Sequence, residues 1–142
     1  MEIRLFEPKY RDDIIFMILE AKNAFGRMPH LNEDLLDIGT YYISTGNMFW
    51  IAIDDNDRVI GTIGTKIISE NEMWLKRLYV KPAMKRQGIG KKLYEKAEEF
   101  AMEKGIYTIY TKFSADYAEA QKFYPSVGFE ETAPFEMVKY LK

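Results

Sequence analysis

The residues best suited to chemistry lie in a short basic segment that contains two glycines. From Lys85 to Lys92 the sequence is Lys-Arg-Gln-Gly-Ile-Gly-Lys-Lys. Gly88 and Gly90 lack a Cβ, so a ligand can approach their backbone closely. A long helix is expected to start at Gly88, and the free N–H groups of a helix N-terminus bind anions. The segment therefore predicts a binding site for a phosphate or pyrophosphate group.

Two common phosphate motifs do not fit this segment. A P-loop requires Gly at the position of Lys85 and Ser or Thr at the position of Lys92. A dinucleotide-binding fingerprint requires a third Gly where Leu93 stands. Taken alone, the segment is also compatible with a Gly-containing turn followed by a solvated basic helix start.

Composition excludes several other chemistries. The 142-residue chain has no Cys and one His, His30. This excludes disulfides, Cys-ligated zinc, a thiol nucleophile and any site with several His, so no metal is expected. Twenty Lys and Arg oppose twenty-two Asp and Glu, and the formal net charge of -2 gives no electrostatic case for a nucleic-acid partner. The length fits a single domain of residues 1–142.

The sequence also predicts where the protein resides. Its longest apolar runs, 14–19 and 48–53, have six residues each, whereas a membrane-spanning helix needs about 20. The N-terminus has no basic region followed by an apolar core, so no signal peptide is expected. A cytoplasmic protein without a membrane partner is predicted.

Strands and helices are expected in the order βααβββαβαββ. Strands are predicted near 3–6, 48–54, 59–68, 74–80, 106–113, 129–130 and 135–141, and helices over 12–21, 32–46, 88–104 and 114–124. Hairpins join the early strands, and helices join the later ones. This order predicts an α/β (α+β mixed) fold, with a central mixed, mostly antiparallel sheet of about seven strands flanked by four helices.

Two local features of these elements can be tested against the structure. Strict alternation along 74–80 places Leu75, Arg77 and Tyr79 on one face of the sheet. The opposite face would carry Trp74, Lys76, Leu78 and Val80. The last helix is expected to end before Pro125.

Two further motifs flank the basic segment. The sequence Leu-Tyr-Val-Lys-Pro at 78–82 precedes it, and Ala-Gln-Lys-Phe-Tyr at 120–124, with Gly-Phe at 128–129, follows it. Together with Gln-Gly-Ile-Gly at 87–90, they resemble the GNAT superfamily of N-acetyltransferases. The resemblance covers the whole chain in element order and is strongest from 74 to 129, so a GNAT-like domain is expected.

The resemblance implies acetyl-CoA as co-substrate. Its pyrophosphate would lie on the Gly-containing loop, and its pantetheine arm would lie between the splayed strands 74–81 and 106–113. Lys85 stands where the family usually has Arg or Gln, so Arg86 would take more of the phosphate contact. The implied CoA-binding residues are Leu78, Tyr79, Val80, Lys85, Arg86, Gln87, Gly88, Ile89, Gly90, Lys91, Ser114, Tyr117 and Phe123.

The resemblance also implies direct attack of a primary amine on the thioester. Tyr124 matches the family's general acid, which protonates the departing thiolate, and a phenol with a pKa near 10 holds its proton at pH 7. The alternative is that Tyr124 is a packed aromatic residue beside Phe123. Candidates for the general base are Glu70, Glu72 and His30. Glu72 is favoured because it begins the strand that would hold the thioester, although a solvated turn residue is the simpler explanation.

The acceptor is expected to contact residues 25–42 and the last strands. It would be a small molecule or a peptide with a primary amine, and a homodimer is one expected assembly. The acidic residues Glu33, Asp34 and Asp37 could attract a cationic amine, but they also fit an ordinary helix N-terminus. Aromatic and other side chains that could line a pocket, or belong to the core, are Phe25, Met28, His30, Tyr41 and Tyr42.

Two other functions compete with acetyl transfer. A non-catalytic CoA-binding sensor or regulatory module would keep the fold and lose the chemistry, and Tyr124 argues against that loss. A nucleotide-binding protein of another kind is disfavoured by the two motifs that do not fit.

Overall fold

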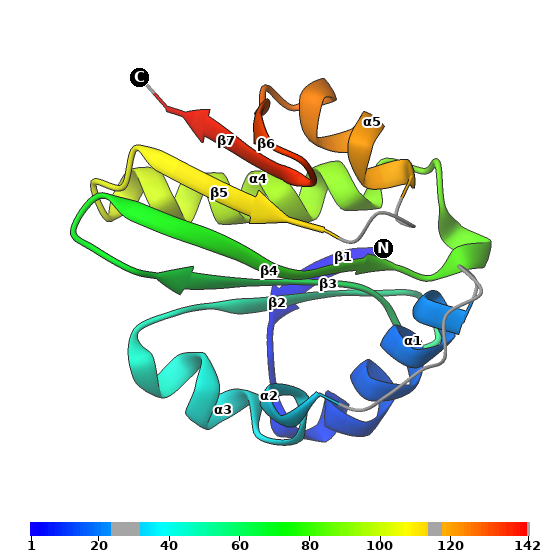
Figure 1. The fold of residues 1–142 in the computed structure, drawn as a ribbon. Coiled ribbons are helices and arrows are strands. Elements are labelled where there is room, and N and C mark those ends of the chain that lie inside the picture. The colour runs from blue at the N-terminus through cyan, green and yellow to red at the C-terminus, as the bar shows by residue number, and fades with distance from the viewer. Residues whose placement is uncertain (24–31, 114–117, 142) are drawn as a thin grey trace.

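One seven-stranded sheet organises the chain. The computed structural model describes residues 1–23, 32–113 and 118–141 (Figure 1). The strands lie in the order β1-β2-β3-β4-β5-β7-β6, and all neighbours pair antiparallel except β4 and β5. The mixed, mostly antiparallel sheet is therefore confirmed. The strands are β1 (Glu2–Leu5), β2 (Phe49–Ile53), β3 (Val59–Ile67), β4 (Glu72–Val80), β5 (Thr108–Lys112), β6 (Glu130–Ala133) and β7 (Glu136–Tyr140).

Helices cover both faces of the sheet, as Figure 1 shows. They are α1 (Arg11–Asn23), α2 (Glu33–Leu36), α3 (Ile38–Tyr41), α4 (Ile89–Glu103) and α5 (Ala118–Ser126). Among the described residues, none of these helices is long and apolar enough to cross a membrane.

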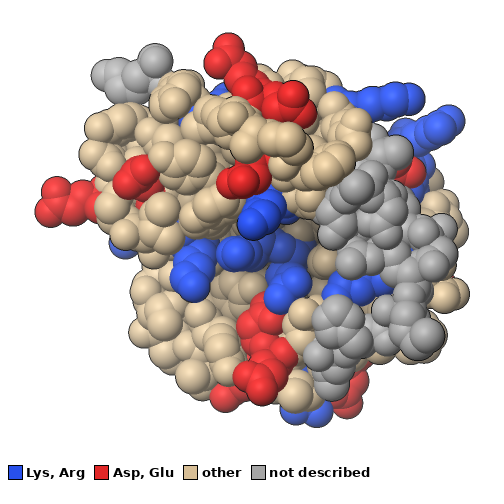
Figure 2. Space-filling model, viewed as in Figure 1, with Lys and Arg blue, Asp and Glu red and all other residues tan. Residues whose placement is uncertain are grey.

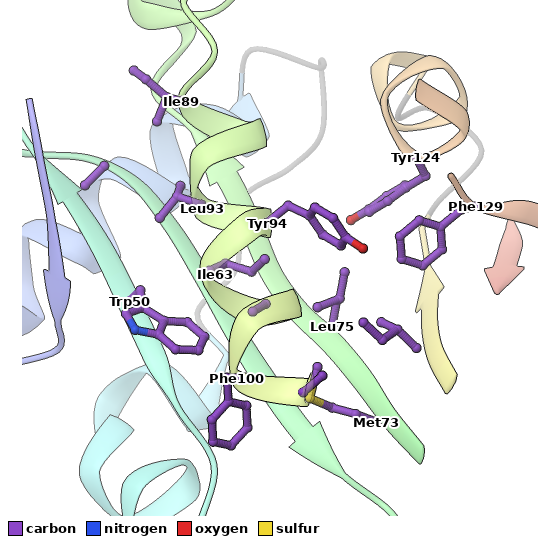
Figure 3. Close-up of a cluster of buried hydrophobic side chains, with 14 of the residues drawn as sticks. Trp50, Ile63, Met73, Leu75, Ile89, Leu93, Tyr94, Phe100, Tyr124 and Phe129 are labelled. Atoms are coloured by element: carbon purple, nitrogen blue, oxygen red, sulfur yellow. The ribbon is translucent and has the colours of Figure 1, made fainter. Parts of the chain in front are cut away.

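The two faces of the sheet carry separate hydrophobic cores, and β2 contributes to both. Trp50 and Ala52 point into the core under α4, part of which Figure 3 shows. Phe49, Ile51 and Ile53 point into the core under α1. Each large apolar side chain buried in this way contributes about 1.5–3 kcal/mol relative to exposure. The buried residues of α4 recur at helical spacing and include Ile89, Leu93, Ala97, Phe100 and Ala101.

A β-bulge interrupts β4 at Arg77. The β3–β4 register passes from Gly64↔Lys76 to Thr62↔Tyr79, so β4 carries one extra residue there. Arg77 has a φ of 55°, in the left-handed region. Its backbone oxygen accepts a hydrogen bond of 2.8 Å from the Thr62 hydroxyl. Because a bulge leaves an extra residue outside the regular ladder, the alternation of side chains shifts beyond it.

The predicted faces of this strand are wrong as a result. Tyr79 packs against the core under α1, on the opposite face from its neighbours. Strict alternation assumed a regular strand, and the extra residue at the bulge reverses the facing of every later side chain. The β4 residues that pack in the core under α4 are Met73 and Leu75 before the bulge and Leu78 and Val80 after it.

The predicted helix over 32–46 is divided into two one-turn helices, α2 and α3, followed by a 3₁₀ turn at Ile43–Thr45. Asp37 separates them with φ −145° and ψ 68°, and its carboxylate accepts a hydrogen bond from the Thr40 amide at 3.2 Å. A short acidic side chain that bonds nearby backbone favours a cap over a helix interior. Gly39, the second residue of α3, weakens the helix further. The acidic residue that looked like part of one helix therefore divides it.

Helix α5 also departs from expectation, because Pro125 lies inside it. Proline has a helical φ but no N–H, so near the end of a helix it costs only one backbone bond. Beyond it, the amides of Val127 and Phe129 both donate to the carbonyl of Tyr124, at 3.2 and 3.0 Å. The helix therefore ends after Pro125 and not before it.

Candidate functional site

A fork between β4 and β5 forms a cleft at one end of the strands. The two strands pair at only three positions, the last of which is Trp74↔Tyr110. Beyond that pair β4 continues to Val80 and β5 continues to Lys112, and a cleft of about 530 Å³ opens between them. On this side of β4, the backbone groups beyond the fork have no strand partner among the described residues. They can therefore bond an extended ligand.

The basic segment lies at the open end of this cleft. Gly88 caps the N-terminus of α4 with a φ of 78°, and a Cβ placed there would meet no atom within 4 Å. Arg86 also has a positive φ, 67°. Gly88 has no side chain to cap this helix end, and Gly88, Ile89 and Gly90 line the cleft, so the first N–H groups of α4 can attract anions there. The basic side chains that line this end are Lys85, Arg86 and Lys91.

Tyr124 lines the cleft from α5 and lies among aromatic rings. Its ring stacks on Phe113 at 5.9 Å and meets Phe123 and Phe129 edge-on at 5.4 and 5.3 Å. Figure 3 shows the Tyr124 side chain extending from α5 toward α4. Burial raises the pKa of Tyr124 to about 12, although the nearby Thr111 hydroxyl opposes the shift. The phenol therefore stays protonated at neutral pH and can donate.

A partly buried ion pair joins the bulge of β4 to α2. Arg77 lines the cleft, and its guanidinium donates two hydrogen bonds to Asp34, at 2.9 and 2.8 Å. The Tyr42 hydroxyl donates a third at 2.7 Å. Burial acts to raise the pKa of Asp34, but the bonds from Arg77 and Tyr42 outweigh it and hold the pKa below its ordinary value. Asp34 is therefore an ionised carboxylate occupied by internal donors.

The structure brings most of the implied CoA-binding residues together. Gln87 is exposed and is not among the residues that line the cleft. Ser114 and Tyr117 lie outside the described residues. Those that line the cleft, with Tyr124, are Leu78, Tyr79, Val80, Lys85, Arg86, Gly88, Ile89, Gly90, Lys91 and Phe123.

The candidate bases lie elsewhere. Glu72 begins β4 outside the cleft lining, where it accepts hydrogen bonds from the hydroxyls of Tyr110 at 2.6 Å and Ser69 at 2.9 Å. The bond from Tyr110, followed by that from Ser69, lowers the pKa of Glu72. Glu70 is exposed and does not line the cleft. His30 lies outside the described residues.

Of the residues expected to recognise the acceptor, several serve the structure. Tyr42 is buried in the core under α1, Tyr41 is exposed, and Glu33 accepts a bond from the Tyr41 hydroxyl at 3.5 Å. Phe25 and Met28 lie outside the described residues.

Sequence reasoning missed several residues of the cleft. Most of them lie at or just beyond the end of the pairing between two strands distant in sequence, which no local pattern contains. They include Trp74, Lys76, Arg77, Thr111, Lys112 and Glu119.

The chain is similar to known proteins in both sequence and structure. Residues 15–129 match the family described as Acetyltransferase (GNAT) family. A probable N-acetyltransferase camello of Xenopus laevis is 32% identical over 115 residues, which cover 76% of this chain and 52% of that protein. N-acetylaspartate synthetase of Rattus norvegicus is 33% identical over 101 residues, 70% of this chain and 33% of that protein. The chain thus spans about half the length, or less, of these curated relatives.

Solved structures match over nearly the full chain. A GNAT-family acetyltransferase of Staphylococcus aureus Mu50 superposes with a TM-score of 0.91 and 28% identity, covering 99% of both chains. The PaiA N-acetyltransferase of Thermoplasma acidophilum, solved in complex with coenzyme A, superposes with a TM-score of 0.81 and 25% identity, covering 98% of both chains.

Proposed function

Since the chain belongs to the GNAT family of acetyltransferases, we propose that it transfers an acetyl group from acetyl-CoA to a primary amine. The observation that carries this proposal is that one cleft joins three features: the N-terminus of α4, the fork between β4 and β5, and the phenol of Tyr124. An extended thioester co-substrate needs an anion site, an edge to bond and a proton donor. The N-terminus of α4 can supply the anion site, the fork can supply the strand edge, and Tyr124 can supply the proton.

The open end of the cleft would hold the pyrophosphate of acetyl-CoA. The N–H groups of α4 and the side chains of Lys85, Arg86 and Lys91 provide donors and positive charge. The empty space beside Gly88 lets phosphate oxygens approach the backbone. The pantetheine arm would bond the free edge of β4 near Leu78 and Val80. Gln87, Ser114 and Tyr117 remain predicted contacts from the family resemblance.

The chemical step needs no covalent bond to the protein. The amine nitrogen attacks the thioester carbon, a backbone N–H of β4 stabilises the developing oxyanion, and the carbon–sulfur bond breaks. Tyr124 donates its proton to the leaving thiolate, the acylated nitrogen loses its extra proton to solvent, and Tyr124 regains a proton from solvent. Its pKa of about 12 keeps it protonated before the step.

The acceptor must lose a proton before it attacks. Among the described residues that line the cleft the carboxylate is Glu119, which pairs with Lys85 at 3.0 Å near the phosphate end. We therefore propose that water at the open fork accepts the proton that the ammonium group loses. Glu72 remains a predicted general base, although its side chain lies outside the cleft lining. A cytoplasmic location, a single domain over 1–142 and a homodimer also remain predictions.

The direct test is CoA release from acetyl-CoA with a panel of amines, together with calorimetric titration of acetyl-CoA and ATP. We expect acetyl-CoA to bind, ATP not to bind, and CoA release to require an amine. Binding of acetyl-CoA without release for any amine would instead favour a CoA-binding regulatory module. Failure to bind acetyl-CoA would contradict the assignment of the cleft.

A further inference from the structure

Two lysines flank the point where the fork opens. Trp74↔Tyr110 is the last pair of the β4–β5 ladder, and two residues further along each strand the side chain is a lysine, Lys76 on β4 and Lys112 on β5. Side chains two residues apart share a face of a sheet. Both lysines line the cleft. We call Lys76 and Lys112 the fork lysines.

An aromatic floor lies beside the fork lysines. The rings of Trp74 and Tyr110 lie 5.3 Å apart, and the ammonium of Lys76 lies 5.6 Å from the Trp74 ring. Lys66 adds a third ammonium group, because it pairs with Trp74 across the β3–β4 register. Figure 2 shows basic side chains gathered at the centre of this face of the molecule.

The neighbouring carboxylates do not neutralise this charge. Within residues 1–23, 32–113 and 118–141, neither fork lysine forms an ion pair with a carboxylate. Asp34 is occupied by Arg77 and Tyr42. Glu72 is occupied by two hydroxyls. Glu136 pairs with Lys112 in the β5–β7 register but forms no ion pair with it.

The electrostatics of Lys76 show that the charges are crowded. Its pKa lies below the ordinary value, first because of burial and then because of Lys66 and Arg77, while Asp34 opposes the shift and Lys112 adds to it. Among the described residues the exposed fork lysines form no ion pair with a carboxylate, so their like charges favour an anionic ligand.

Acetyl-CoA does not account for this cluster. Its phosphates would lie at the N-terminus of α4, where three other basic side chains line the cleft. Lys76 precedes the end of β4 by four residues, which corresponds to roughly 13 Å of strand. The cluster lies beside the fork, where the ladder between β4 and β5 ends.

We propose that the fork lysines bind a carboxylate of the acceptor, so that the acceptor is a small amino acid whose carboxylate lies a few bonds from its primary amine. The inference rests on the proposed acetyl transfer and reverses the expectation of a cationic acceptor. The fork lysines would hold the carboxylate near Trp74, and the amine would point into the fork. Their positive charge would also favour the neutral form of the bound amine.

The test compares amines that differ only in the carboxylate. The amino acids L-alanine, β-alanine and L-aspartate are assayed against four amines without a carboxylate. These are L-alaninamide, β-alaninamide, 1,4-diaminobutane as a diamine, and a Gly-Gly-Gly-amide peptide as a peptide acceptor. We expect kcat/KM to be at least 10-fold higher for an amino acid than for its amide, the usual effect of one charged hydrogen bond.

Substitutions assign the preference to the fork. Lys76→Met and Lys112→Met keep the apolar stem and should each lower kcat/KM for the preferred amino acid by about 10- to 100-fold, mainly through KM. Activity toward the amide should change less than 3-fold. Lys96→Met, at an exposed position of α4, should leave both unchanged.

The outcomes separate this inference from the proposed function. A preference for 1,4-diaminobutane, the peptide or the amides would overturn the inference and leave acetyl transfer intact. Absence of CoA release for every amine would overturn the proposed function. In that case, calorimetric titration of the CoA complex with N-acetyl-L-alanine, N-acetyl-β-alanine and N-acetyl-L-aspartate decides the inference: binding of at least one that Lys112→Met abolishes supports it, and binding of none overturns it.

Discussion

Tyr124 lies where the proposed reaction needs a proton, and its ring and hydroxyl can be separated experimentally. Tyr124→Phe keeps the stacking on Phe113 and removes only the hydroxyl. We expect kcat to fall by roughly 10²- to 10⁴-fold, the usual effect of a positioned general acid. The dissociation constant of acetyl-CoA should stay within about 2-fold of the wild-type value. Steady-state kinetics and calorimetry give the two values.

A matched control separates the acid role from a general effect of losing a phenol. Tyr140→Phe removes the hydroxyl of a largely exposed tyrosine on β7 and should leave kcat unchanged. Wild-type kcat in Tyr124→Phe, with chemistry shown to limit turnover, would leave Tyr124 as a packing residue only.

Asp34 tests the ion pair behind the fork. Asp34→Asn leaves the half-buried Arg77 without its carboxylate, so the free energy of unfolding should fall by about 1–3 kcal/mol. The lowered pKa of Asp34 means that its contribution is present above about pH 4 and is lost as the pH falls further. Urea unfolding of both proteins between pH 3 and 7 should therefore show a difference that shrinks at the acid end. A difference that does not change with pH would contradict the ionised pair.

At the scale of elements, the sequence predicted those features that depend on residues close together in the chain. The spacing of Ile89, Leu93 and Ala97 fixes the buried face of α4, and Gly88 fixes where this helix begins, because both effects act within a few residues. The bulge at Arg77 depends on which β3 residue each β4 residue meets. The side chains of β4 fit the alternation of a strand about equally well with or without an extra residue at Arg77. No pattern within the strand could therefore reveal the bulge.

The candidate site divides along the same line. The segment proposed to hold the phosphates is continuous in sequence, so its glycines and basic residues could be recognised from the sequence alone. Lys76 and Lys112 line the same cleft because two strands distant in sequence pair in parallel for three residues and then separate. Neither lysine is distinctive within its own strand, so their shared position in the cleft follows only from the register of the folded sheet.

The two ends of α4 allow a clean test of the loop. Gly88 and Gly105 have nearly equal φ values of 78° and 75°, and a Cβ at either position would meet no atom within 4 Å. Gly88→Val and Gly105→Val should therefore each destabilise the protein by a similar 1–2 kcal/mol of backbone strain. Only Gly88→Val should weaken acetyl-CoA binding, by more than 10-fold, because its side chain fills the space meant for phosphate. Calorimetry that shows equal affinities in the two variants would exclude this loop as the phosphate site.

At the scale of the whole molecule, positive charge is concentrated around the cleft although the net charge is -2. Arg86→Ala should raise KM for acetyl-CoA about 10-fold and change kcat little, since a phosphate contact stabilises ground state and transition state alike. Raising the ionic strength from 0.05 to 0.5 M should weaken the wild type more than the variant, because salt screens the charge that the variant lacks. A loss confined to kcat would place Arg86 at the chemistry.

The short β4–β5 ladder also bears on how the chain reaches its fold. Strands β1 to β4 pair antiparallel, and the β2–β3–β4 pairings form across short turns. The β4–β5 ladder instead pairs at only three positions and closes a loop of roughly 35 residues that contains α4. We expect the fork to assemble late and to open more readily than the sheet centre. Amide hydrogen exchange should then be faster in β5 than in β3, and acetyl-CoA, by bridging the fork, should slow exchange most in β5. Equal protection of both strands in the free protein would show that the fork is as firmly held as the strands that lead to it.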